Sequence, residues 1–326
     1  MAHHSVVTIP LAAAVAMLYA RLVATLPPPC PRAGDRPPPH TPFTAPLYST
    51  RGIAAFFLVW LGEFKLLLLT SGRGPLDPAL RPIPFVFTAT LPVKLLPQSP
   101  DAAAGAENVA LSFLRVAIMV ALLQVFHVKD QMHPYAVFAL YGIYIYCFLD
   151  FLLPCLAALG RALGMGLEPQ FHKPYRSASL QDFWGRRWNL MASAVLRPAV
   201  YVPVRAGLGA PAGVLATFLV SGLMHEVIAY DITFRLPTGQ LTAFFLLHGA
   251  SVCTEKWCAR RWPEYTRLPR VVGTPLVVLF VVGTALWLFF PPLFGDGMDD
   301  RFIAEFNALL ASLVDAGGTL LQLAGI

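Results

Sequence analysis

Long apolar stretches limit what this chain can fold into more than any other feature of its sequence. A helix needs about 20 apolar residues to cross the roughly 30 Å hydrocarbon core of a bilayer. We predict such spans at residues 5–26, 53–69, 109–128, 136–159, 212–230 and 271–290. Weaker candidates lie at residues 241–253 and 303–326. The sequence therefore predicts an all-α polytopic membrane protein with about eight transmembrane helices.

Composition supports a membrane protein and excludes several other classes. Charged residues make up 13% of the 326 residues and hydrophobic residues 56%, whereas a soluble domain carries about 25% charged residues. A soluble globular enzyme, a disordered chain and a disulfide framework are thereby excluded. The net charge of +6 does not indicate a nucleic-acid partner, because the basic residues lie in short segments between apolar stretches, as cytoplasmic loops require.

The loop charges and the prolines predict the orientation and the domain division. Residues 160–211 and 254–270 are rich in Lys and Arg, and two spans separate them, so both are expected on the cytoplasmic side. The hairpin at residues 231–240 then faces the lumen. Residues 27–46 contain nine prolines and predict an extended linker. We divide the chain into an N-terminal transmembrane helix with its linker (1–50) and a domain holding the other spans (51–326).

His225 is the histidine that most strongly suggests chemistry. It lies within LVSGLMHEVIAY, residues 219–230, and an ionisable side chain inside a span indicates a reaction or a pathway by default. The structural alternative is a histidine that hydrogen-bonds neighbouring helices. Glu226 points about 100° away on the helix, so we expect it to be an interface anchor or part of a buried ion pair. Ala229 replaces the second histidine of a zinc-binding H-E-x-x-H motif, and no metal site is expected. His248, also in an apolar stretch, stays ambiguous.

A second concentration of polar and aromatic residues precedes this span. Residues 171–189 read FHKPYRSASLQDFWGRRWN. An interfacial helix with an aromatic belt of tryptophans and snorkelling arginines accounts for much of this composition. It does not account for the density of polar side chains, which include Ser177, Ser179, Gln181, Asp182 and Asn189.

Motifs that the sequence lacks narrow the chemistry. It contains no G-x-S-x-G nucleophile elbow, no P-loop and no G-x-G-x-x-G phosphate cradle. A lone intramembrane histidine without a nucleophile motif suits proton abstraction from a substrate. A transporter is the alternative from another class, although we find no repeat between the halves of the chain. Its polar pathway would use Glu63, Lys65, Arg115, Asp150 and His225.

Several stretches together resemble a known family. They are SLQDFWGRRWNLM (179–191) with the following LRPAVYVPVR, LVSGLMHE (219–226), RGIAAFFLVWLGEFKLLLLTSGRGPL (51–76) with LPVKL after it, and FFP (289–291). From about residue 51 to the C-terminus, the chain resembles the plant wax synthases. These are long-chain-alcohol O-fatty-acyltransferases of the membrane-bound O-acyltransferase superfamily.

The resemblance implies a helical bundle around an internal tunnel, in the endoplasmic reticulum. Acyl-CoA, the co-substrate, would enter from the cytosol and a lipid alcohol from the membrane, with no metal or redox cofactor. The resemblance also implies that His225 is the central catalytic residue and Asn189 the second polar residue of the site. Plant sterol O-acyltransferases share this subfamily, so the acceptor stays open between a long-chain fatty alcohol and a sterol.

These implications suggest a mechanism. A neutral His225 would take the hydroxyl proton while the alcohol oxygen attacks the thioester carbonyl. Asn189 would donate to the developing oxyanion, orient His225, or merely cap or crosslink helices. Five residues of the segment 171–189, which precedes the span of His225, are expected to bind acyl-CoA on the cytosolic side. These candidates are Lys173, Asp182, Arg186, Arg187 and Trp188.

Overall fold

The computed structural model describes residues 60–95, 109–162, 164–262, 269–295, 298 and 300. Three of our predictions lie outside these residues: the span at 5–26, the proline-rich linker, and the span at 303–326. The domain boundary at residue 50 lies outside them as well. Within the described part, regular structure is helical apart from one isolated bridge between Leu95 and Leu167.

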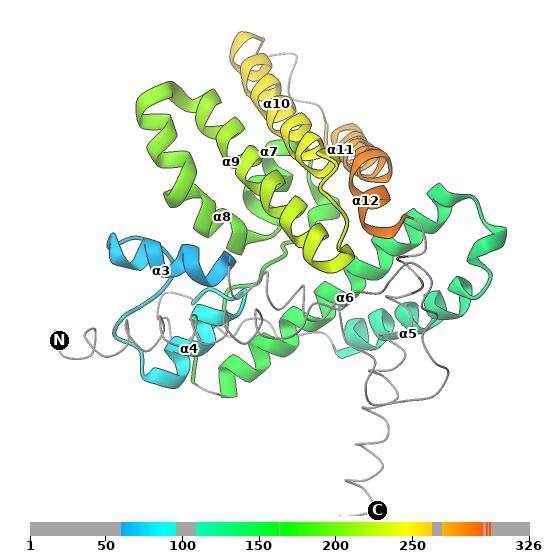
Figure 1. Cartoon of the computed structure of the whole chain (residues 1–326), viewed down its shortest axis with the longest axis horizontal. Coiled ribbons are helices and arrows are strands. Elements are labelled where there is room, and N and C mark those ends of the chain that lie inside the picture. The colour runs from blue at the N-terminus through cyan, green and yellow to red at the C-terminus, as the bar shows by residue number, and fades with distance from the viewer. Residues whose placement is uncertain are drawn as a thin grey trace, which may run out of the picture.

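Figure 1 shows the helices in chain order from blue to orange. The α-helices are α3 (Gly62–Thr70), α4 (Pro82–Thr90), α5 (Val109–Phe126), α6 (Pro134–Ala162), α7 (Leu180–Asp182), α8 (Leu190–Leu196), α9 (Val202–Thr233), α10 (Gln240–Arg261), α11 (Arg270–Thr284) and α12 (Phe290–Phe294). Short 3-10 turns occur at η2 (Lys129–Gln131) and η3 (Pro174–Arg176), and wide π-helical turns at η4 (Phe183–Arg187), η5 (Arg197–Tyr201) and η6 (Ala285–Phe289).

Three helical segments in the described part of the chain are long and apolar enough to cross a membrane. They are Pro134–Arg161, Leu190–Thr233 and Arg270–Phe294, and a shorter apolar helix covers Phe113–Phe126. The helices expected at residues 136–159, 212–230 and 271–290 are therefore confirmed as candidate spans. The total of about eight spans stays a prediction.

The second half of the predicted loop at residues 160–211 is helical, at residues 190–208. This stretch folds back on the rest of α9 at Gly209, whose φ of 86° and ψ of 171° are essentially restricted to glycine. Beyond the reversal, Gly213 lies so close to η5 that a Cβ there would be 3.0 Å from the Tyr201 carbonyl oxygen. The result is a helical hairpin, visible in light green in Figure 1.

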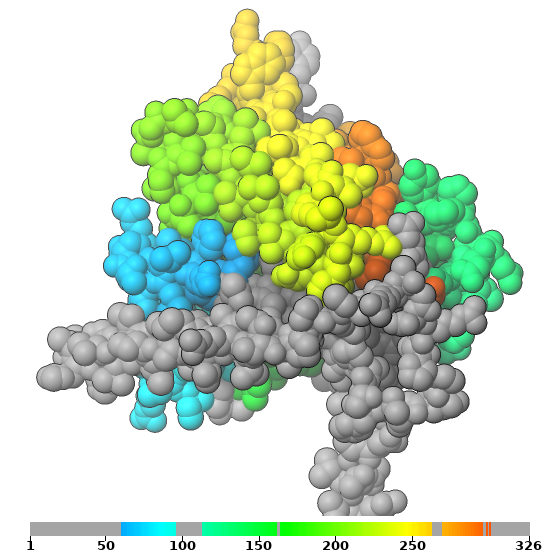
Figure 2. Space-filling model, in the orientation of Figure 1, coloured from blue at the N-terminus to red at the C-terminus, as the bar shows by residue number. Residues whose placement is uncertain are grey.

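α9 and α10 pack closely, and small residues make this possible. A Cβ added at Gly222 would lie 2.7 Å from Thr242 Cα, and one at Gly249 would lie 2.9 Å from Phe218 Cβ. Residues without a large side chain let membrane helices approach to backbone contact. Figure 2 shows the light green and yellow helices side by side on one face.

Several charged residues in the predicted spans join neighbouring helices. Lys65 is fully buried, and its ammonium donates to three backbone oxygens at the end of α4. These are the oxygens of Thr88, Leu91 and Val93, at 2.7, 2.6 and 3.4 Å. Arg115 of α5 forms an ion pair with Asp150 of α6 at 2.8 Å. Lys65, Arg115 and Asp150 therefore have a structural role, which accounts for their presence in the spans without a transport pathway.

Candidate active site

His225 lies in the C-terminal third of α9, half-buried, with its ring directed toward α10 and η6. Its Nδ1 is 2.7 Å from the carbonyl oxygen of Ser221. Because a carbonyl oxygen only accepts hydrogen bonds, Nδ1 carries the hydrogen and the lone pair of the neutral ring is on Nε2. The ring centroid is 4.3 Å from that of Phe245 and 5.8 Å from that of Phe289. The backbone thus selects the tautomer in which Nε2 can accept a proton.

Glu226, the next residue, acts as an anchor between helices. Its carboxylate is buried, and Oε1 accepts a hydrogen bond of 3.1 Å from the backbone N–H of Thr242. That N–H belongs to the first turn of α10, where backbone donors have no partner inside their own helix. Glu226 therefore caps α10 from the neighbouring helix, which fits the anchor role expected from the sequence.

Asn189 occupies the N-cap of α8. Its backbone adopts a left-handed conformation with a φ of 45°, and its Oδ1 accepts a hydrogen bond of 3.1 Å from the Ala192 N–H. The residue is exposed. The capping role that we considered as an alternative is therefore present, and the side-chain oxygen is the atom that performs it. The amide N–H groups are the donors through which Asn189 would assist a reaction.

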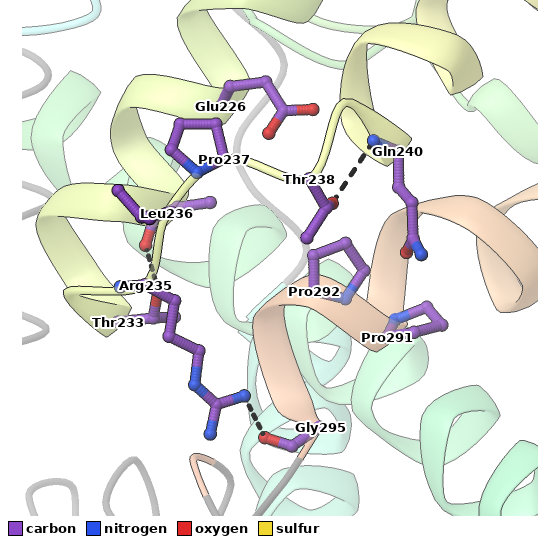
Figure 3. A pocket seen from close by; sticks show the side chains of 11 residues that line it. Glu226, Thr233, Arg235, Leu236, Pro237, Thr238, Gln240, Pro291, Pro292 and Gly295 are labelled. Atoms are coloured by element: carbon purple, nitrogen blue, oxygen red, sulfur yellow. Dashed lines mark hydrogen bonds between the residues drawn. The ribbon is translucent and has the colours of Figure 1, made fainter.

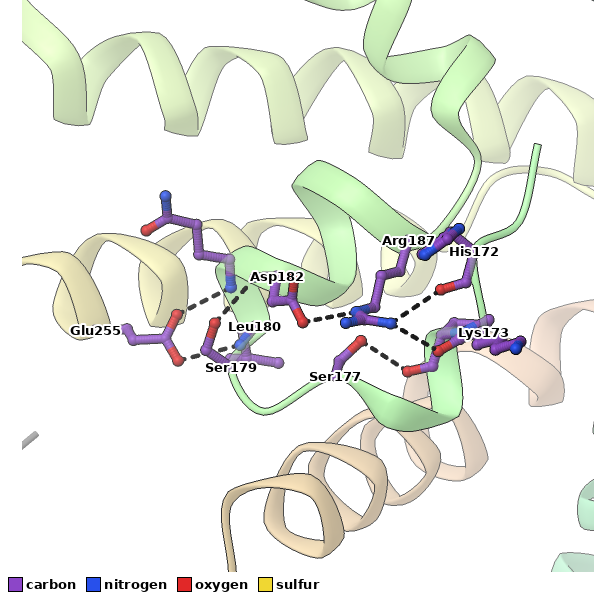
Figure 4. A network of polar contacts seen from close by, with 10 residues as sticks. His172, Lys173, Ser177, Ser179, Leu180, Asp182, Arg187 and Glu255 are labelled. Carbon is purple, nitrogen blue, oxygen red and sulfur yellow. Dashed lines mark hydrogen bonds and ion pairs between the residues drawn. The ribbon is translucent and has the colours of Figure 1, made fainter. Parts of the chain in front are cut away.

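Two of the expected acyl-CoA-binding residues bind each other. Arg187 Nε donates to Asp182 Oδ2 at 2.7 Å, and the same guanidinium donates to the backbone oxygen of His172 at 3.1 Å. These contacts close the loop before α8, as Figure 4 shows. Arg186 and Lys173, by contrast, are exposed.

Trp188 lies in an aromatic cluster. Its ring stacks on Phe183, with 5.5 Å between centroids and 13° between planes, and it also contacts Phe171 at 4.9 Å. Packing of this kind fixes the end of η4, directly before Asn189.

Glu255 of α10 holds the beginning of the same segment, and nothing in the sequence pointed to this role. Its two carboxylate oxygens accept hydrogen bonds from the backbone N–H groups of Leu180 and Gln181, at 3.0 and 2.9 Å. Figure 4 shows both bonds. These bonds bring the basic segments 160–211 and 254–270, both predicted to be cytoplasmic, to the same end of α10.

His248, which the sequence left ambiguous, is fully buried and bonded through both ring nitrogens. Trp184 Nε1 donates to Nδ1 at 3.0 Å, and Nε2 is 2.9 Å from Thr284 Oγ1. The imidazole therefore joins η4, α10 and the end of α11.

A pocket of about 350 Å³ lies between the α9–α10 connection and α12. Figure 3 shows its lining, which includes the polar side chains of Glu226, Thr233, Arg235, Thr238 and Gln240. Arg235 spans it, donating to the backbone oxygen of Gly295 at 3.1 Å. Glu226, which precedes the other lining residues in the chain, directly follows His225 along α9. Within the described residues, no group of three or more His, Cys, Asp or Glu side chains could hold a metal ion.

Comparison with known proteins identifies the family of this chain. The Membrane bound O-acyl transferase family matches residues 167–247, which include Asn189 and His225. The long-chain-alcohol O-fatty-acyltransferase of Simmondsia chinensis is 36% identical over 276 residues, 79% of this chain and 78% of that protein. The probable long-chain-alcohol O-fatty-acyltransferase 3 of Arabidopsis thaliana is 40% identical over 271 residues, covering 78% and 77%. The acyl-CoA–sterol O-acyltransferase 1 of the same plant is 34% identical over 284 residues, 81% of each chain.

The chain therefore belongs to the Membrane bound O-acyl transferase family. Within that family it is an acyltransferase of the wax synthase type.

Proposed function

We propose that the protein transfers a fatty acyl group from acyl-CoA to the hydroxyl of a long-chain alcohol and so forms a wax ester. His225 is the general base. The observation that carries this proposal is the bond from Nδ1 to the Ser221 oxygen, which leaves the proton-accepting lone pair on Nε2 within a membrane span. Relatives named as long-chain-alcohol O-fatty-acyltransferases support the substrate class.

The reaction needs a proton acceptor, since a neutral alcohol is a weak nucleophile near pH 7. Nε2 of His225 takes the hydroxyl proton as the alcohol oxygen bonds to the thioester carbonyl carbon. The carbon–sulfur bond then breaks, and the departing CoA thiolate recovers the proton from the imidazolium. No covalent enzyme intermediate is required, which agrees with the absence of a nucleophile motif.

Asn189 serves the same reaction in this proposal. Its Oδ1 caps α8, so the amide is oriented and its N–H groups become the donors for the developing oxyanion. Loss of one such donor costs about 10²- to 10³-fold in rate.

Acyl-CoA approaches from the end of α10 at which the two basic segments lie. Arg186 and Lys173 are exposed cations suited to the phosphates of CoA, whereas Arg187, Asp182 and Trp188 shape the loop that carries them. The acyl and alcohol chains occupy a tunnel between the helices, where each buried methylene contributes about 0.8 kcal/mol. We place the protein in the endoplasmic reticulum membrane.

Replacement of His225 tests the general base. His225→Ala is expected to lose about 10²- to 10⁴-fold in ester formation while still inserting in membranes. His127→Ala is the matched control, because His127 makes the same local bond, from Nδ1 to the Leu123 oxygen at 2.9 Å, and lies in the connection after α5. Acyl transfer by microsomes with radiolabelled acyl-CoA measures both. Near-normal ester formation by His225→Ala would refute the assignment.

A sterol is the second candidate acceptor, since a sterol O-acyltransferase is among the relatives. Expression in cells that lack neutral-lipid synthesis, fed first with fatty alcohol and then with sterol, separates the two. Thin-layer analysis is expected to show wax ester. Sterol ester alone would replace the proposed acceptor without affecting the role of His225.

A further inference from the structure

The hydrogen bonds of His248 determine its protonation. An indole N–H only donates, so the bond from Trp184 places the lone pair of the imidazole on Nδ1 and its hydrogen on Nε2. That hydrogen is donated to Thr284 Oγ1, whose own hydroxyl donates to the backbone oxygen of Phe280 at 2.7 Å. A second proton on Nδ1 would face the Trp184 N–H. The ring is therefore held neutral and links three segments.

α10 holds the segment of Trp184 at a second point. Glu255 lies seven residues after His248, on the same face of the helix and about 10 Å farther along it. It accepts the backbone hydrogens of Leu180 and Gln181. Residues 180–184 are thus fixed to α10 at both ends.

Trp184 in turn contacts a neighbour of each proposed site residue. Its backbone oxygen accepts a hydrogen bond of 3.3 Å from Ser193 Oγ, and this bond bridges the turn that carries Asn189. Its ring centroid is 5.7 Å from that of Phe245, the ring that packs on His225. A shift of Trp184 would therefore move the turn and the wall beside His225 together.

We propose that His248 is a positioning residue for acyl transfer: it holds the Trp184 indole, which fixes the Asn189 turn and the Phe245 ring against His225. The inference rests on the proposed function. His248 does not exchange a proton with the substrate, because both of its ring nitrogens are engaged with protein groups.

The test compares two replacements in the full-length protein. His248→Leu fills the space but makes neither bond, and its kcat is expected to fall about 10- to 100-fold, the effect of a displacement near 1 Å at a reacting centre. The KM for acyl-CoA and the shape of the pH–rate profile are expected to stay unchanged. His248→Gln keeps one acceptor and one donor and is expected to recover most of kcat. His127→Gln is the control, and rates are normalised to folded protein from size-exclusion chromatography.

A variant of Trp184 tests whether His248 acts through the Trp184 indole. Trp184→Phe removes the donor, and is expected to lower kcat as His248→Leu does, with no further loss in the double variant because the two residues act as one unit. The inference is overturned if His248→Leu lowers only the yield of folded protein, if His248→Gln is as impaired as His248→Leu, or if the pH profile shifts. His225→Ala, assayed in parallel, tests the general base separately, since its activity does not depend on the outcome at position 248.

Discussion

At the scale of single residues, side chains that satisfy the backbone of a neighbouring helix recur in this protein. Lys65 does so for α4, Glu226 for α10 and Glu255 for α7. Helix ends leave backbone groups without partners, and in hydrocarbon no water can replace them. Lys65 satisfies three of these groups, Glu255 two and Glu226 one.

Lys65 provides the clearest test of this role. Lys65→Met keeps much of the side-chain volume but removes the donor to three carbonyl oxygens. Leaving buried acceptors unsatisfied costs about 1–3 kcal/mol, so the variant is expected to unfold at a lower temperature in detergent. Arg81→Met, at an exposed position before α4, is the control. Equal melting temperatures for Lys65→Met and the parent protein would contradict the capping role.

Residue roles were only partly predictable from the sequence. His225 was identified because an ionisable group in a span is costly, and a resemblance drew attention to Asn189. The roles of His248 and Glu255 depend on partners 64 and 75 residues away in the chain. Spacing along one helix carries no information about such pairings, which only the packing of α10 on the preceding segment creates.

At the scale of helices, apolar length predicted the long elements α6 and α11 well, whereas the reversal at Gly209, inside α9, was missed. Arg197 and Arg205 lie before Gly209, so the sequence indicated a basic loop between spans there and not a helix that reverses at this glycine. The backbone conformation of this one glycine produces it.

Gly209→Ala tests whether this glycine sets the hairpin. A side chain at a φ of 86° and a ψ of 171° is strained by about 1–3 kcal/mol, and we expect a lower melting temperature in detergent. Gly207→Ala is the matched control, because a Cβ there meets nothing within 4 Å and no left-handed φ is required. In a helix, alanine is favoured over glycine by about 1 kcal/mol, so this variant is expected to be at least as stable as the parent. A similar effect of both changes would show that the backbone at Gly209 is not what holds the hairpin.

At the scale of the whole molecule, the two ends of α10 differ in charge. Its last turn carries Arg260 and Arg261, and Glu255 brings the basic segment before α8 to that end. The α9–α10 connection lies at the other end of α10, beside the pocket. The positive-inside tendency then predicts that the basic end is cytosolic and the connection luminal.

Glycosylation acceptors inserted at the two ends test this orientation. The chain contains no Asn-X-Ser/Thr sequence of its own, so any glycan must come from the insert, and acceptors are modified only in the lumen. A spaced acceptor after Leu236, which is 84% exposed in the connection, is expected to gain a glycan that endoglycosidase removes. The same insert after Arg261 is expected to stay unmodified, and ester formation by each variant confirms that it folds. A glycan after Arg261 but not after Leu236 would reverse the orientation. It would also place Arg186 and Lys173 away from cytosolic acyl-CoA, which would remove their proposed role while leaving the chemistry of His225 intact.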